Sequence, residues 1–235
     1  MKIKFVLSLL FQLIFFYPML LSDEIDIISD NIKILENGNI IESIQTNAII
    51  KKRGLYIEGD YSVYNKETEI IKLENNVLFN DQVKNINVET EIANYNKKLD
   101  ILKTIGITNI KIENKYKIIS SDMIYDRGSQ KIYSKKETTI KDLSGNVYNL
   151  EDSFEFDLNR EIITTKKTNI IDTDNNIYIF ENAKINLTTK EILGKELVID
   201  FVDNYFGISD NDPILKGRSA ISNEEQTKIY KTVFS

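Results

Sequence analysis

Tyr64-Asn65-Lys66-Glu67 is the first copy of a motif in which an aromatic residue is followed by a polar turn. Later copies are Tyr95-Asn96-Lys97-Lys98, Tyr125-Asp126-Arg127-Gly128, Phe156-Asp157-Leu158-Asn159 and, more faintly, Ile185-Asn186-Leu187-Thr188. The first residues of successive copies are 31, 30, 31 and 29 positions apart. A second marker with a similar period is found at Asn76-Val77, Asn109-Ile110, Thr139-Ile140 and Asn169-Ile170. A fixed period of about thirty residues indicates a repeat architecture.

Apolar and polar residues alternate on both sides of the turn in the first copy. The alternation runs from Leu55 to Val63, a polar turn follows at 65–68, and the alternation resumes from Ile71 to Phe79. Period-two alternation is typical of a β-strand with two unlike faces, and so short a turn can join only antiparallel strands. The sequence therefore predicts an all-β fold of tandem antiparallel strand–turn–strand repeats.

The same pattern predicts how the chain is divided. We expect a first strand pair over 24–50, turned at Asn37-Gly38, which is a strong hairpin signal. Later units are expected at about 51–82, 83–114, 115–145, 146–176 and 177–208. Asn211-Asp212-Pro213 breaks the pattern, and the residues that follow belong to no unit.

The amino terminus has the pattern of a secretory signal peptide. Lys2 and Lys4 precede an almost wholly apolar stretch from Phe5 to Leu21, and Ser22 offers a small residue for cleavage. An uncleaved anchor is the alternative, but seventeen residues are at the short limit for a membrane span. We expect a signal peptide over 1–22, a β domain over 23–210 and a junction segment over 211–235.

Composition excludes several kinds of chemistry. The chain of 235 residues contains no cysteine and no histidine, which excludes thiol nucleophiles, Cys/His zinc sites and Ser-His-Asp triads. Without Lys2 and Lys4, 28 basic residues face 36 acidic ones, a formal charge of −8 that disfavours a nucleic-acid surface. We predict no enzyme activity, no catalytic residue, no metal, no cofactor and no nucleic-acid partner.

One acidic stretch, Asp172-Thr173-Asp174-Asn175-Asn176, resembles the start of a calcium loop. Such a loop requires glycine at its sixth position and glutamate at its twelfth, where this chain has Ile177 and Ala183. A polar hairpin turn is the better interpretation.

Taken together, these units resemble the OstA domains of the lipopolysaccharide (LPS) transport machinery. The resemblance rests on the turn openings Tyr64-Asn65 and Tyr125-Asp126, and on the steps Asn75-Asn76-Val77 and Thr108-Asn109-Ile110. The closing stretches 211–220 and 227–235 are similar to the junction before the membrane barrel in the outer-membrane LPS-assembly (LptD) type. The junction favours the LptD type, as a fragment that lacks the barrel, while the repeats alone also fit the soluble bridge (LptA) and anchored (LptC) types.

The resemblance implies a β-jellyroll, open along one edge like a taco, in the periplasm at the outer membrane. Its implied partners are the acyl chains of lipid A, a second jellyroll paired edge to edge, and, in the LptD type, a barrel with its lipoprotein plug. In that type the junction leads into a cysteine-bearing segment and a barrel, so we expect this chain to be a fragment if it is of that type.

Residues on the apolar parity of the strands are the expected lining of the trough. They are Leu55, Ile57, Tyr61, Val63, Leu73, Val77, Phe79, Ile86, Val88, Ile92, Ile107 and Ile110. Two other hypotheses remain: a structural exported β-repeat protein with a solid core and no ligand, and an exported carbohydrate-active enzyme. The enzyme would need a pair of carboxylates across a cleft, to which nothing in the sequence points.

Overall fold

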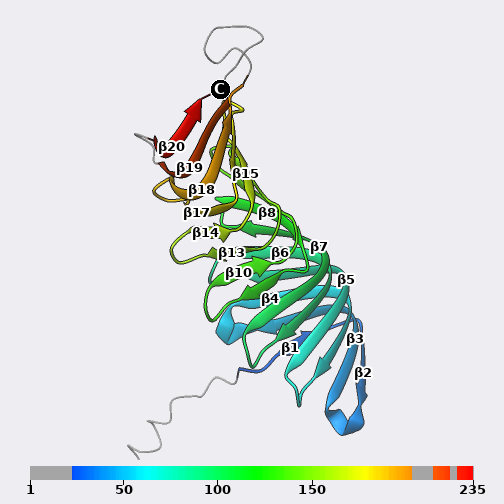
Figure 1. Ribbon diagram of the computed structural model, residues 1–235. Coiled ribbons are helices and arrows are strands. Elements are labelled where there is room, and N and C mark those ends of the chain that lie inside the picture. Colours follow the sequence, from blue (N-terminus) through cyan, green and yellow to red (C-terminus); the bar gives the residue numbers. More distant parts are fainter. Residues whose placement is uncertain (1–22, 203–213, 223–226, 235) are drawn as a thin grey trace, which may run out of the picture.

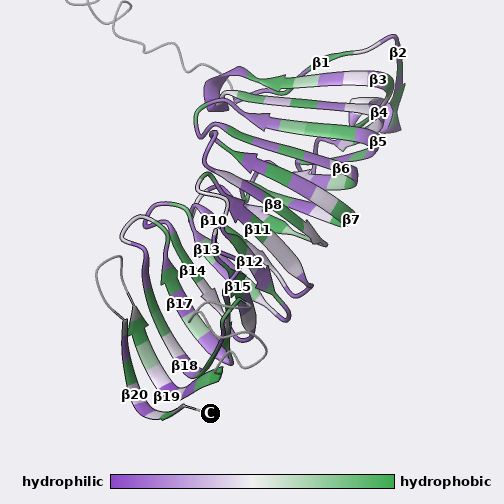
Figure 2. Cartoon of the chain, turned by 90° about the horizontal axis from the view of Figure 1, so that it is seen from above, coloured by the Kyte–Doolittle hydropathy of each residue, from purple (hydrophilic) through white to green (hydrophobic). Residues whose placement is uncertain are grey.

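The computed structural model describes residues 23–202, 214–222 and 227–234. The expected signal peptide, 1–22, and the Asn211-Asp212-Pro213 break lie outside these residues. The described strands form one antiparallel sheet of twenty strands, stacked along an elongated molecule from β1–β3 at one end to β18–β20 at the other (Figures 1 and 2). The predicted all-β jellyroll of strand–turn–strand repeats is confirmed.

The strands change in length along the chain. The first part contains β1 (Asp26–Ile28), β2 (Asn31–Leu35), β3 (Ile40–Ile50) and two 3-10 turns, η1 (Glu36–Gly38) and η2 (Lys51–Arg53). Four long strands follow: β4 (Leu55–Asn65), β5 (Ile70–Asp81), β6 (Ile86–Asn96) and β7 (Ile101–Ile112). Next come short strands, β8 (Tyr116–Ser121), β9 (Ile124–Asp126), β10 (Lys131–Ser134), β11 (Thr138–Asp142), β12 (Val147–Leu150), β13 (Phe154–Asp157), β14 (Ile162–Thr165), β15 (Thr168–Ile171), β16 (Ile177–Phe180) and β17 (Asn182–Asn186). The last three are β18 (Glu191–Asp200), β19 (Ile214–Ser222) and β20 (Thr227–Phe234).

Each long strand bends near its middle, and beyond β7 the bend divides the strands in two. Left-handed residues mark the bend, among them Gln45 (φ 54°), Asn76 (φ 51°), Gly106 (φ 80°) and Asp122 (φ 51°). Strands β8, β11, β12, β15 and β16 pair in sequence on one side, and β9, β10, β13, β14 and β17 on the other. We call these sides the first and second half-sheets; they face each other across a trough.

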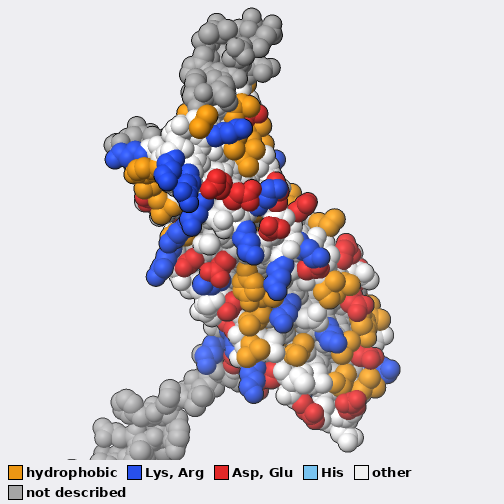
Figure 3. All heavy atoms as spheres, in the orientation of Figure 1, with side chains coloured by type: hydrophobic (Ala, Val, Ile, Leu, Met, Phe, Trp, Pro, Cys, Tyr) orange, Lys and Arg blue, Asp and Glu red, His pale blue; other side chains and the backbone are white. Residues whose placement is uncertain are grey.

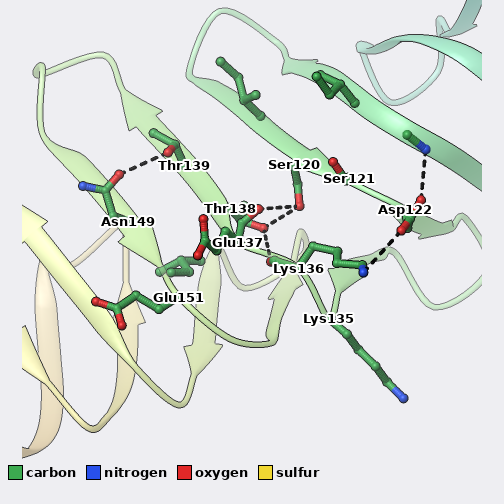
Figure 4. A pocket seen from close by; sticks show the side chains of 14 residues that line it. Ser120, Ser121, Asp122, Lys135, Lys136, Glu137, Thr138, Thr139, Asn149 and Glu151 are labelled. Atoms are coloured by element: carbon green, nitrogen blue, oxygen red, sulfur yellow. Dashed lines mark hydrogen bonds and ion pairs between the residues drawn. The ribbon is translucent and has the colours of Figure 1, made fainter.

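Buried hydroxyl groups line the inside of the bend, which we call the fold line. Ser43 lies 2.8 Å from Ser62, and the Thr138 hydroxyl donates to Ser120 at 2.7 Å (Figure 4). The Ser120 hydroxyl in turn donates to the carbonyl of Glu137 at 3.0 Å. Since an interrupted ladder leaves backbone groups unpaired, these hydroxyls supply partners where the two half-sheets separate.

The motif that set the period forms the turns of the second half-sheet. Its anchors Tyr64, Tyr95, Tyr125, Phe156 and Ile185 are all at most 7% exposed and lie in one inward row. In every copy the following Asn or Asp accepts a hydrogen bond from the backbone N–H three residues on, at 2.9–3.1 Å. This side-chain cap explains why the polar residue follows the anchor.

Two other local predictions can be compared with the structure. The hairpin at Asn37-Gly38 is confirmed, with both residues left-handed (φ 54° and 98°) as a type I′ turn requires. The stretch 214–235 is expected from the sequence to belong to no unit, but its described residues continue the sheet: β19 pairs with β18, and β20 with β19. Leu215 and Ala220 both pack inward although they are five positions apart, because the pairing of β19 with β18 skips Arg218, opposite the left-handed Glu196 (φ 50°).

Candidate functional site

The amino-terminal part of the trough is packed solid. Eight of the predicted lining residues are at most 1% exposed there: Leu55, Ile57, Leu73, Val77, Phe79, Ile86, Val88 and Ile110. The Phe79 ring lies 5.5 Å from that of Tyr95 and 6.4 Å from that of Tyr125, between centroids, so side chains from the two half-sheets meet. These rings are in contact range, and they fill this part of the trough with a core.

The other four predicted lining residues are not in the core. Tyr61, Val63 and Ile92 are half-buried, and Ile107 is 69% exposed. The register shifts by one residue between Glu58 and Tyr61 where β4 pairs with β5, and again between Thr90 and Ile92 where β6 pairs with β7. In β4 and β6 the inward parity changes at this shift, so Tyr61, Val63 and Ile92 lie off the core. Ile107 instead has the outward parity of β7, which it shares with the exposed Ile105.

An apolar cavity of about 270 Å³ lies in the carboxyl-terminal part of the trough. Its walls come from both half-sheets and from β18 and β19: Tyr148, Ile170, Tyr178, Phe180, Ile185, Ile192, Leu197, Ile199 and Ala220. Polar residues of the hairpin turns, Asn146, Asp172, Asn186 and Lys190, surround its outer end. None of the wall residues was among the predicted lining, because the repeats gave no sign of where large side chains leave space.

Gly194 fixes one wall of this cavity. A Cβ at this position would lie 2.1 Å from Cδ1 of Phe180, so only glycine allows the ring to lie this close to β18. Across the sheet Gly194 pairs with Ala183 on one side and Ala220 on the other. This row of small residues leaves room for the Phe180 ring against β18.

The hairpin turns form two rims that meet at the mouth of the trough, opposite the fold line. The first rim consists of the turns 51–54, 82–85, 113–115, 143–146 and 172–176, with the strand ends beside them. The second consists of 66–69, 97–100, 127–130, 158–161 and 187–190. Ion pairs join the rims at three places along the trough.

The strongest of these junctions, which we call the clasp, lies over the packed part. Arg127 of the second rim contacts Asp81 of the first, with 2.6 Å between Nε and Oδ2, and the Tyr125 hydroxyl donates to the same oxygen at 3.0 Å. Arg53 of the first rim donates to the carbonyl of Lys97 at 2.8 Å and lies 3.2 Å from Asp100.

The clasp is buried, and its pKa shifts follow from that. The side chain of Asp81 is fully buried and that of Arg127 is 8% exposed. Burial and the neighbouring Asp81 raise the pKa of Tyr125 well above its usual value, so its hydroxyl stays a donor. Burial alone would lower the pKa of Arg127, but its hydrogen bonds to Asp81 and Asp100 outweigh that effect and raise it.

Two weaker junctions follow toward the carboxyl terminus. Lys115 contacts Glu161 at 2.8 Å, and the Tyr116 hydroxyl donates to the same carboxylate at 3.0 Å. Beside the cavity, Lys190 contacts Asp142 at 3.4 Å. The hydrogen bond from Lys115 holds the pKa of Glu161 below its usual value, although partial burial opposes the shift.

A larger hollow, of about 980 Å³, lies on the outer face of the bend between β7, β8 and β11 (Figure 4). It is lined by exposed Ile107 and Ile119 together with charged side chains, among them an Asp122–Lys136 pair at 3.8 Å. The face of the molecule seen in Figure 3 carries a mixture of acidic, basic and apolar side chains. An open, charged hollow cannot keep acyl chains from water, so the interior cavity is the better candidate site.

The acidic stretch at Asp172 is the turn between β15 and β16. The Asp172 carboxylate accepts hydrogen bonds from the backbone N–H of Asp174 and Asn176, both at 2.9 Å, and from the Tyr178 hydroxyl. The hairpin interpretation is therefore confirmed. Among the described residues there is no cluster of acidic side chains that could hold a metal ion.

Comparison with known proteins finds no family model and no curated relative that matches this sequence. Within the described ranges, no helix has the length and apolar character needed to cross a membrane. We therefore infer a function from the trough, its cavity and its mouth.

Proposed function

We propose that the protein is an exported lipid carrier whose trough shields the acyl chains of LPS on their way to the outer membrane. The observation that supports this most is the apolar cavity between the half-sheets, which reaches the mouth at Asn146 and Lys190. Burying an acyl chain is favourable by about 0.8 kcal/mol per CH2 group, so even part of one chain gives useful affinity.

The polar residues at the outer end of the cavity suit the head group of such a lipid. Lys190, Asn146 and Asn186 lie where the head group of a bound lipid would emerge from the mouth. An ammonium group and two amides can bind phosphate or hydroxyl groups by hydrogen bonds. The site thus combines apolar walls with a few polar groups at one end, as ligand pockets usually do.

The two ends of the sheet support the proposed edge-to-edge partner. Among the described strands, β20 pairs only with β19, and β1 and β2 pair only with β3. Tyr230 and Val233 of β20 are 52% and 61% exposed. An unpaired edge is a template for another strand, so a second jellyroll can extend this sheet.

Lipid binding tests the proposal. A fluorescent fatty acid that brightens in apolar surroundings is titrated into the purified protein and then displaced with LPS. Ile199→Glu places a charge in the cavity wall and should abolish binding, whereas Val198→Glu, on the outward face next to it, should leave binding unchanged. A wild-type protein that binds neither probe nor LPS contradicts the proposal.

A structural β-repeat protein without a ligand is the second candidate. The packed interior around Phe79 favours it, because the two half-sheets there already bury each other. The titration separates the two, since a structural protein gives no displaceable signal and is indifferent to Ile199→Glu beyond its stability.

A further inference from the structure

The three junctions across the mouth differ in how many donors each carboxylate keeps from its own rim when the rims separate. We propose that the mouth opens from that end, with the Lys190–Asp142 pair as the gate over the cavity and the clasp as the end that stays shut. What enters through the gate depends on the proposed lipid function, but the order of opening does not.

The clasp is costly to open because it would leave a buried charge behind. Asp81 is fully buried, and from its own rim it receives only the backbone N–H of Lys84, at 3.1 Å. Its other partners, Arg127 and the Tyr125 hydroxyl, belong to the opposite rim and would leave together. A buried carboxylate that loses its cation is strongly destabilised, so this junction should stay closed.

The Lys115–Glu161 junction is intermediate. Its two side chains, Lys115 and Glu161, are 45% and 23% exposed, so water can replace part of the hydrogen bonding that is lost when the rims separate. Yet Glu161 would lose Lys115 and the Tyr116 hydroxyl together, since both belong to the opposite rim, and would keep only one donor from its own rim that the structure describes, the Thr188 hydroxyl at 2.7 Å. This junction is weaker than the clasp and stronger than a single surface ion pair.

Opening the gate breaks the fewest hydrogen bonds of the three junctions. Asp142 keeps three donors from its own rim: the backbone and side-chain N–H groups of Asn146, both at 2.9 Å, and the Tyr148 hydroxyl at 3.1 Å. Lys190 is 33% exposed and can exchange its one long contact, 3.4 Å, for water. The Asp142 side chain is only 3% exposed, but the three donors that it keeps still satisfy the buried carboxylate after Lys190 has left.

The gate also lies where an opening would matter. Lys190 belongs to the outer end of the cavity, and Tyr148, which donates to Asp142, belongs to its wall. Separating the rims there exposes the cavity while the clasp holds the packed part together. A cavity of about 270 Å³ is at the small end for ligand sites, so a large lipid needs such an opening to enter.

Thiol labelling measures the opening without any lipid, and the natural chain contributes no thiol because it contains no cysteine. One protein carries Ile170→Cys, in the cavity wall; the other carries Ile71→Cys, in the packed part near the clasp. Both isoleucines are at most 4% exposed, so reaction with a thiol reagent requires opening. Ala220→Cys and Ala93→Cys repeat the comparison with almost no change in volume.

We expect the Ile170→Cys thiol to react faster than the Ile71→Cys thiol. Adding Lys190→Gln should raise the first rate about two- to fivefold and leave the second unchanged. Lys184→Gln, which removes an exposed lysine from the outward face of β17, should change neither. Equal rates at both positions, or a Lys190→Gln variant that labels like the parent, would overturn the proposed gate.

These results are independent of the lipid titration. If the thiols behave as expected but no lipid binds, the gate stands and the lipid function fails. If lipid binds but Lys190→Gln does not change labelling, the lipid function stands and the gate fails.

Discussion

Replacing Arg127 with methionine should remove a large part of the stability of this fold. Methionine keeps an unbranched side chain but cannot contact Asp81, whose carboxylate is fully buried. Asp81 would keep the backbone N–H of Lys84 and the Tyr125 hydroxyl, both neutral donors. Asp100 would suffer less, because it is 27% exposed and keeps Arg53 and Tyr95 as partners.

The expected cost can be estimated from burial. Removing one partner of a buried ion pair costs about 3–5 kcal/mol, against a total stability of about 5–15 kcal/mol for a typical domain. With a urea m-value of ~3 kcal/mol/M, the unfolding midpoint should fall by roughly 1–2 M. Arg160→Met is the matched control, because this arginine is 75% exposed and lies 3.9 Å from Asp157. It should cost less than about 0.5 kcal/mol.

The double variant Arg127→Met/Asp81→Asn identifies the cause. If the penalty comes from an uncompensated buried charge, neutralising Asp81 should restore part of the stability lost in Arg127→Met. The reasoning is refuted if Arg127→Met costs no more than Arg160→Met, or if the double variant is less stable than either single variant.

Substitutions at Glu161 and Gly194 test the second junction and the packing of Phe180 against β18. Glu161 has a folded-state pKa below its usual value, so its stabilising effect is present above that usual value and lost as the pH falls through the folded one. Between about pH 5 and pH 3 the wild type should therefore lose up to ~1 kcal/mol more than Glu161→Gln in urea unfolding, and parallel pH profiles would contradict this. Gly194→Ala should cost about 1–3 kcal/mol, because the new Cβ would lie 2.1 Å from the Phe180 ring. Gly128→Ala, with its nearest contact at 3.4 Å, is the control and should be close to neutral; equal costs would mean that the ring moves aside freely.

Local signals in the sequence were sufficient for the repeats and their turns. The Asn65 and Asn96 side chains cap the turns that follow them, and Asn37-Gly38 forms its hairpin, because these contacts lie within a few residues of each other. In β4 and β6 the parity could be read only as far as the bend, because the register shifts there. In β7 the parity is the same on both sides of Gly106, and Ile107 lies on the outer face because it shares the parity of the exposed Ile105.

The cavity and the mouth could not be predicted, because both depend on which residues meet across the trough. Arg127 and Asp81 are 46 positions apart, and nothing local marks them as partners. The bend brings the two half-sheets face to face, so contacts between their rims follow from the tertiary fold.

The proposed function requires lipid acyl chains to lie inside the carboxyl-terminal part of the trough. The most direct test places a photo-reactive phenylalanine derivative at Tyr178, in the cavity wall, or at Ile179, the next residue, which faces the other side of the sheet. After irradiation in cells that export the protein, the account predicts an adduct with LPS at Tyr178 and none at Ile179. Equal labelling at both positions, or none at Tyr178, would contradict it.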